Sequence, residues 1–69
     1  MELNFPIVVK NKRAFMTLME TIERERPEIF WNCGEEPTGY SPPVTDFPVK
    51  IYLNYWSDNN KMSYHSIRG

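Results

Sequence analysis

The last third of the chain constrains its fold most strongly, because two sets of residues, one of them apolar throughout, alternate strictly over residues 47–56. The apolar members of this alternation are Phe47, Val49, Ile51, Leu53 and Tyr55. Such a period of two is typical of a β-strand with one buried face. Residues 57–60 then supply the Asp and Asn side chains that favour turns, and residues 61–68 can return as a second strand. The pattern predicts a β-hairpin whose two faces differ in polarity.

Upstream of the hairpin, the sequence predicts a strand followed by an amphipathic helix. Residues 3–9 alternate as a strand does. Pro6, which has no N–H to donate, favours an edge strand, or a strand whose backbone at that position points to solvent. Asn11 is a favourable helix N-cap. Apolar residues recur at helical spacing over residues 12–26, and Pro27 ends the helix.

A second short strand, residues 29–33, and a long loop rich in Gly and Pro, residues 34–46, connect this helix to the hairpin. The predicted order is β-α-β-β-β, within one small domain spanning residues 1–69. We therefore expect an α+β two-layer sandwich, with one helix packed on a mostly antiparallel four-stranded sheet. Two strand orders remain open: the first two strands are adjacent and parallel, joined by a right-handed crossover, or the hairpin lies between them.

The hairpin has an outer face that one helix cannot cover. A four-residue turn at 57–60 would place Trp56 opposite Lys61 and Leu53 opposite Tyr64. The helix would cover the apolar face, and the other face would be open to solvent. Its residues form the candidate interaction surface, with the 34–46 loop as a rim: Lys50, Tyr52, Trp56, Lys61 and His65. An alternative interpretation is cross-strand packing, with Trp56 over Lys61 and Tyr52 beside His65.

Groups that could perform catalysis are scarce in this chain. It contains one histidine, His65, and one cysteine, Cys33, and their spacing suggests no nucleophile–base pair. A zinc site needs three or four ligands, which these residues do not supply. Residues 34–40 carry two glutamates and place Tyr40 where a phosphate-binding loop has its lysine. We therefore expect no enzyme activity, no cofactor and no metal.

Charge and hydropathy limit the classes of partner and the compartment. The formal net charge of −1 disfavours nucleic-acid binding, which depends on neutralising phosphates. No segment approaches the run of about 18 apolar residues that a membrane span needs, and the N-terminus lacks the pattern of a signal peptide. A lone cysteine suits a reducing compartment. We therefore expect a cytoplasmic protein that does not bind membranes.

Several residues together carry a resemblance to a known group of proteins. They are Leu18 and Ile22 on the helix, Trp31 on the second strand, Gly34 and Pro37 at the following turn, and Ile51, Leu53, Met62 and Tyr64 on the hairpin. Over roughly residues 5–67, the chain resembles small uncharacterised proteins of temperate phages and prophages of Gram-positive bacteria. The resemblance implies a small accessory protein made in the bacterial host cytosol. It implies no catalytic residue, ligand or cofactor.

These observations favour a small non-enzymatic interaction module that binds another protein. Two alternatives remain open. In the first, the outer face binds single-stranded nucleic acid, with bases stacked on aromatic rings and Lys50 and Lys61 near phosphates. In the second, a structural homodimer buries Trp56 and Tyr52 across its interface.

Overall fold

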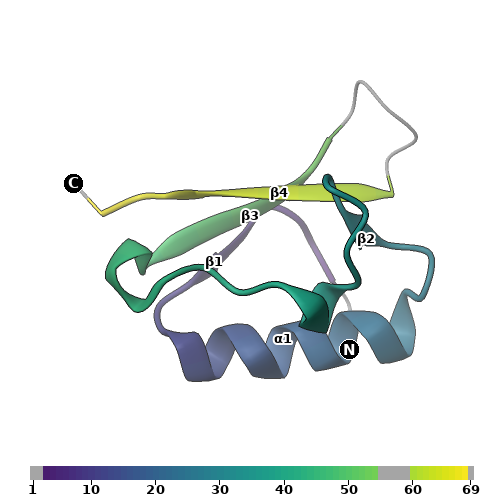
Figure 1. Ribbon diagram of the computed structural model, residues 1–69, viewed down its shortest axis with the longest axis horizontal. Helices are drawn as coiled ribbons and strands as arrows, with labels where there is room; N and C mark the ends of the chain where they lie inside the picture. The colour runs from purple at the N-terminus through teal and green to yellow at the C-terminus, as the bar shows by residue number, and fades with distance from the viewer. Residues whose placement is uncertain (1–2, 55–59, 69) are drawn as a thin grey trace.

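In the part of the chain that the structure describes, one α-helix lies along one face of a four-stranded sheet (Figure 1). The computed structural model describes residues 3–54 and 60–68. The helix is α1 (Lys12–Glu25), and the strands are β1 (Ile7–Val9), β2 (Phe30–Trp31), β3 (Val49–Leu53) and β4 (Lys61–Ser66). Two short 3-10 helices, η1 (Pro37–Gly39) and η2 (Val44–Asp46), lie in the predicted loop. The predicted α+β fold and its β-α-β-β-β order are confirmed.

The strand order is β1-β3-β4-β2, so the hairpin of β3 and β4 lies between the first two strands. β3 pairs antiparallel with β1 and with β4, whereas β2 runs parallel to β4. The edge position of β1 agrees with the expectation from Pro6. However, β1 begins at Ile7 rather than at residue 3, because strand pairing starts only after the proline, which has no N–H for a ladder.

The register of the hairpin differs by two residues from the predicted one. Leu53 lies opposite Met62, and the Asn54 N–H donates to the Lys61 carbonyl at 2.9 Å. The connection therefore runs over residues 55–60, and the prediction that Trp56 opposes Lys61 is wrong. A shift of one residue would have exchanged the two faces, whereas a shift of two leaves each side chain on its own face. The alternation alone therefore does not distinguish these registers.

Local hydrogen bonds define both ends of α1. The Asn11 side chain accepts a hydrogen bond from the Ala14 N–H at 2.9 Å, as expected for an N-cap. At the other end the Arg26 N–H donates to the Ile22 carbonyl, but Arg26 itself has φ −134° and ψ 68°. The residue before a proline is displaced from helical geometry, so the helix ends one residue earlier than predicted.

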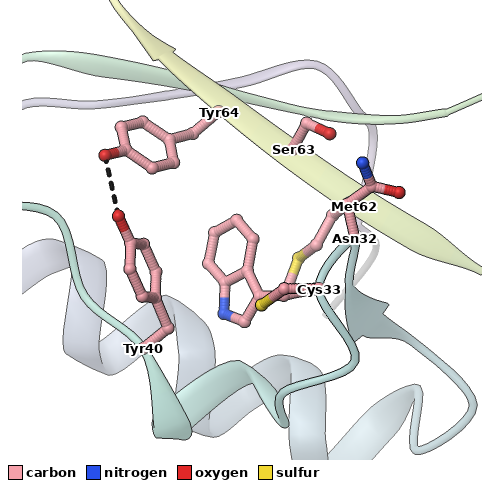
Figure 2. A pocket seen from close by; sticks show the side chains of 7 residues that line it. Asn32, Cys33, Tyr40, Met62, Ser63 and Tyr64 are labelled. Carbon is pink, nitrogen blue, oxygen red and sulfur yellow. Dashed lines mark hydrogen bonds between the residues drawn. The ribbon is translucent and has the colours of Figure 1, made fainter.

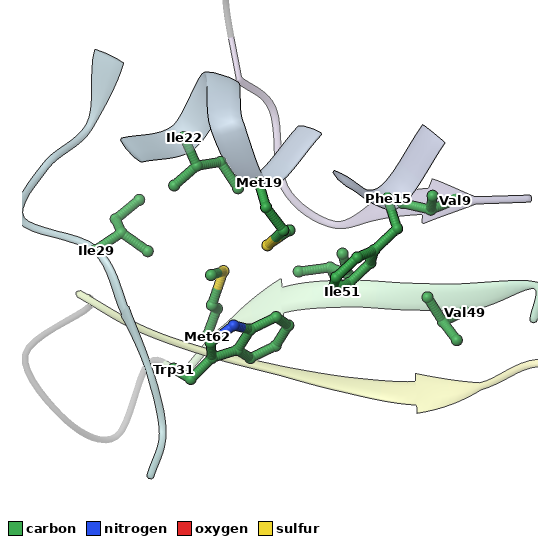
Figure 3. Close-up of a cluster of buried hydrophobic side chains, with 9 residues drawn as sticks. All are labelled: Val9, Phe15, Met19, Ile22, Ile29, Trp31, Val49, Ile51 and Met62. Atoms are coloured by element: carbon green, nitrogen blue, oxygen red, sulfur yellow. The ribbon is translucent and has the colours of Figure 1, made fainter. Parts of the chain in front are cut away.

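The core lies between α1 and the sheet (Figure 3). Its buried apolar side chains are Val9, Phe15, Met19, Ile22, Ile29, Trp31, Val49, Ile51 and Met62. The Phe15 ring stacks on Trp31 with a centroid distance of 6.0 Å and meets the Phe47 ring edge-on at 5.8 Å. The helix stripe predicted from sequence is thus buried, except that Leu18 is only partly covered. Packing of Phe15 against Trp31 fixes the indole that later forms part of the candidate site.

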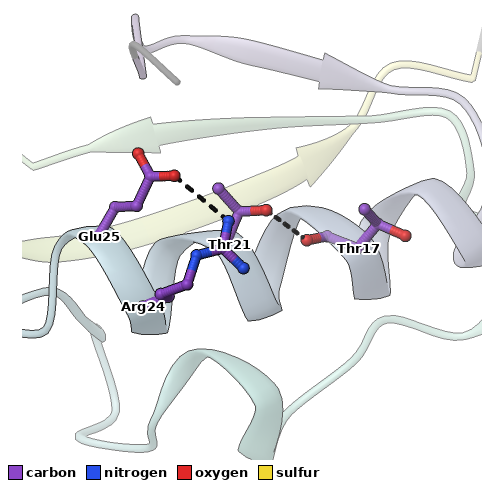
Figure 4. A network of polar contacts seen from close by, with 4 residues as sticks. All are labelled: Thr17, Thr21, Arg24 and Glu25. Atoms are coloured by element: carbon purple, nitrogen blue, oxygen red, sulfur yellow. Dashed lines mark hydrogen bonds and ion pairs between the residues drawn. The ribbon is translucent and has the colours of Figure 1, made fainter.

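A polar residue of α1 is buried without disturbing this core. The Thr21 hydroxyl donates to the Thr17 carbonyl at 2.9 Å within the helix (Figure 4). The neighbouring ion pair, Arg24 Nη2 to Glu25 Oε2 at 3.3 Å, lies at the surface. Exposed pairs of this kind contribute little to stability. This ion pair therefore marks a solvent-exposed part of α1.

Candidate functional site

A pocket of about 420 Å³ opens beside β4, next to the end of β2. Its walls come from the end of β2, the turn after it, the loop before η2 and β4 itself (Figure 2). The lining residues are Trp31, Asn32, Cys33, Tyr40, Met62, Ser63 and Tyr64. Figure 2 shows Tyr40 and Tyr64 on one side of the opening and Asn32 and Cys33 on the other.

The pocket exists because β2 leaves the sheet after two residues. The Asn32 N–H still donates to the Met62 carbonyl at 2.9 Å, but the chain then reverses. The Gly34 N–H donates to the Trp31 carbonyl, and the Trp31 N–H donates to the Glu35 carbonyl, both at 2.8 Å. Gly34 has φ +96°, a conformation that glycine adopts without steric cost. This turn directs the chain away from β4 and leaves space beside Tyr64.

The Trp31 indole forms the inner wall of the pocket. Only 3% of its surface is exposed, and its Nε1–H donates to the Pro37 carbonyl at 3.0 Å. The rings of Tyr40 and Tyr64 meet it edge-on, at centroid distances of 5.6 and 6.1 Å. Because its polar atom is already paired, the indole offers only apolar surface to an incoming group.

Two tyrosines close one end of the pocket, and a carboxylate outside the lining holds one of them. The hydroxyl groups of Tyr40 and Tyr64 are 3.0 Å apart, and the Tyr64 hydroxyl donates to Asp46 Oδ2 at 3.3 Å. The hydrogen bond with Tyr40, the partial burial of the ring and the nearby Asp46 carboxylate together raise the pKa of Tyr64. The raised pKa delays ionisation of Tyr64 in alkali and does not change its protonation at neutral pH, where an ordinary tyrosine is already protonated. Tyr40, 38% exposed, borders the opening.

The edge of β4 beside this pocket carries backbone groups that face away from β3. In an antiparallel ladder, alternate residues direct both N–H and C=O toward the neighbouring strand. Hydrogen bonds from Asn54 N–H to Lys61 C=O and from Ile67 N–H to Pro48 C=O set this alternation. Tyr64 and Ser66 consequently direct their N–H and C=O outward. Within residues 3–54 and 60–68, no strand pairs with these groups, because β2 ends at Trp31.

The sequence-predicted surface lies on the opposite face of the sheet. Lys50 is directly opposite His65, and the Tyr52 and His65 rings are 5.6 Å apart. Lys61 Nζ lies 5.7 Å from the Phe30 ring centroid. The structure therefore brings Lys50, Tyr52 and His65 together, and the predicted packing of Tyr52 beside His65 is confirmed. Trp56, the fifth member of this surface, lies outside the described residues.

Sequence reasoning did not identify the pocket. It assigned Met62 and Tyr64 to the face covered by the helix and Trp31 to a strand, and Tyr40 was one residue of a long loop. The loop does contribute to a site, since Tyr40 and Asp46 both reach Tyr64. The sequence does contain one signal for the pocket: the apolar run before Gly34 is short. A strand that short cannot pair along the whole length of a longer neighbouring strand.

The pocket contains groups suited to binding. Its lining offers two phenols, an indole, a thioether, an amide and the exposed Cys33 thiol, with no carboxylate or imidazole. The Ser63 hydroxyl is already paired, since it donates to Asn54 Oδ1 at 3.1 Å. Among the described residues, no group of three His, Cys, Asp or Glu side chains could hold a metal ion. No helix in the described ranges is long and apolar enough to cross a membrane.

The fold and the pocket define a small α+β protein with an aromatic site at an unpaired sheet edge. Comparison of the chain with models of protein families, with curated proteins and with solved structures finds no match. The resemblance to small phage and prophage proteins therefore stays a prediction.

Proposed function

We propose that this chain is a small non-enzymatic interaction module that binds another protein through the pocket beside β4. The observation that supports this most directly is the coincidence of an aromatic pocket with the outward-facing backbone groups of Tyr64 and Ser66. Tyr and Trp concentrate at binding hot spots because they combine a large contact area with few rotatable bonds. Trp31, Tyr40 and Tyr64 provide three such rings around one opening.

The dimensions of the site suit an anchoring side chain. Its volume of about 420 Å³ exceeds what one apolar side chain occupies, and it is open at the surface. The ring contacts and the Tyr40–Tyr64–Asp46 hydrogen bonds hold its walls in place before a partner arrives. Pre-organised walls reduce the entropy lost on binding. The exposed Cys33 thiol and the resemblance to phage proteins together favour a bacterial cytosol as the place of action.

The test is capture of a partner from nuclease-treated bacterial lysate by the tagged chain. We expect a specific protein to be retained by the wild type and by Tyr52→Ala, but lost with Tyr40→Ala. Each substitution removes one tyrosine ring. Tyr40→Ala alters the pocket, whereas Tyr52→Ala alters the opposite face of the sheet. Loss with Tyr52→Ala alone would assign the contact to the outer face, and loss of every partner on nuclease treatment would favour nucleic acid. Either result, or retention of no protein at all, would overturn the proposal.

A further inference from the structure

We infer that the partner contributes an extended segment, which adds to the edge of β4 as a further strand and inserts one apolar side chain into the pocket. This inference rests on the proposed function and specifies its mode of recognition. Strand addition is a general way in which a sheet edge binds peptides: the main chain gives affinity and alternate side chains give specificity.

The backbone of β4 provides the first requirement. Tyr64 and Ser66 direct their N–H and C=O groups away from β3, two residues apart, as the alternation of the ladder dictates. An extended segment has the complementary spacing of donors and acceptors. The turn at Gly34 takes the chain out of the position that a longer β2 would have occupied, so the segment continues the sheet where β2 stops.

The geometry of the sheet then determines which side chain enters the pocket. Residues directly opposite each other on neighbouring strands project to the same face. The partner residue opposite Tyr64 therefore projects to the face of Tyr64 and Met62, where the pocket lies. The next position on that face, opposite Ser66, is restricted because the Ser66 hydroxyl donates to the Asp46 carbonyl at 2.6 Å. Specificity is thus concentrated at one position.

The lining indicates the chemistry of that residue. The inner wall is the Trp31 indole, whose N–H is already paired, together with the Met62 thioether. No charged side chain lines the pocket, so a charged guest would lose its hydration without gaining an ion pair. An apolar or aromatic side chain, such as Leu, Met or Phe, would bury the most apolar surface there.

Other ways of covering this edge fit less well. Two copies of the chain could pair through their β4 edges as a twofold-symmetric dimer. If both Tyr64 and Ser66 took part, Ser66 of one copy would lie opposite Tyr64 of the other. The pocket would then receive a short hydroxyl that already bonds to Asp46. The opposite edge of the sheet, β1, is only three residues long and follows Pro6, which has no N–H to donate. The β4 edge is therefore the better acceptor for a foreign strand.

The experiment uses random linear peptides displayed on filamentous phage and selected on the full chain. Enriched peptides are synthesised, and each of their amides is methylated in turn. Strand addition predicts that methylation weakens binding about tenfold or more at alternate residues and little at the residues between them. It also predicts an apolar residue at one fixed position, whose replacement by Asp abolishes binding.

Two variants of the chain provide a matched control. Ser66→Pro removes the outward N–H, and Ser66→Ala removes the hydroxyl but keeps that N–H. Since the Ser66 N–H does not pair with β3, neither change removes a hairpin hydrogen bond. Both variants lose the hydroxyl, so their comparison isolates the outward N–H, and we expect Ser66→Pro to bind the selected peptide at least about tenfold more weakly than Ser66→Ala. The scan of methylated peptides needs no variant and remains decisive if Ser66→Pro does not fold.

The outcomes separate this inference from the proposed function. Peptides that need Tyr40 but tolerate methylation at every amide would show that the pocket binds side chains without strand addition. Failure to enrich any peptide over an unrelated protein, or self-association that Ser66→Pro abolishes, would also overturn the inference. In each of these cases a lysate protein lost with Tyr40→Ala would still support the interaction module.

Discussion

The hydroxyl groups of Tyr40 and Tyr64 lie 3.0 Å apart, although the two residues are 24 positions apart in the sequence. This contact joins the long loop to β4, and the two rings also meet at a centroid distance of 5.9 Å. The contact fixes one wall of the pocket, and Tyr64 extends the connection to Asp46. The shape of the candidate site therefore depends on a few polar contacts at its rim, which substitutions can remove one at a time.

Tyr64→Phe removes both hydroxyl contacts and keeps the ring. We expect the free energy of unfolding to fall by about 1 kcal/mol, because two hydrogen bonds are lost while their partners Tyr40 and Asp46 can reach water. Urea denaturation followed by circular dichroism measures this difference. Tyr52→Phe is the matched control, since the Tyr52 hydroxyl forms no hydrogen bond with other described residues, and it should change stability less. Equal losses in the two variants would contradict the role given to the Tyr64 hydroxyl.

The raised pKa of Tyr64 predicts a loss of stability in alkali. The unfolded chain releases this proton near the ordinary tyrosine pKa of about 10, whereas the folded chain retains it. The stability that the protonated Tyr64 hydroxyl gives to the folded chain is therefore fully present below about pH 10, and it declines as the pH rises further. Titration of tyrosinate ultraviolet absorbance should show one tyrosine ionising later than in the denatured chain. Tyr64→Phe should abolish this late component, and its persistence would assign the shift to another residue.

More of the fold than of the candidate site could be predicted from the sequence, because local sequence periods determine which face of an element is buried. The faces of Ile51 and Tyr64 follow from local alternation, and the buried side of α1 follows from the spacing of Phe15, Met19 and Ile22. The register of the hairpin did not follow, because a two-residue shift preserves those faces. The pocket required knowing that β2 stops at Trp31 and that Tyr40 folds back onto Tyr64. Neither fact is expressed in a local sequence period.

Glu23 connects α1 to the loop that carries Tyr40. Its Oε1 accepts hydrogen bonds from the Thr38 N–H at 3.2 Å and the Thr38 hydroxyl at 2.8 Å. We expect Glu23→Ala to destabilise the chain by about 1–2 kcal/mol, because a carboxylate that accepts two hydrogen bonds is lost. Amide hydrogen exchange at Thr38 should also become faster. Exposed Glu20 on the same helix provides the control in Glu20→Ala, and Glu23→Gln, which retains an acceptor, should recover part of the loss. Unchanged exchange at Thr38 in Glu23→Ala would contradict this connection.

The outer face of the sheet, which carries Lys50 and Lys61, is the surface on which nucleic-acid binding can be tested directly. Lys50 lies beside Tyr52 and His65, and Lys61 lies over the Phe30 ring. If a single strand used only these two lysines, a fourfold rise in salt would weaken its binding about sevenfold, from a slope of about −0.7 per phosphate neutralised. Because we assign binding to the pocket, we expect the anisotropy of a labelled oligothymidine to remain unchanged on addition of the chain. Saturable binding with that salt dependence, lost in Lys50→Ala and retained in Tyr40→Ala, would instead establish the outer face as a nucleic-acid surface.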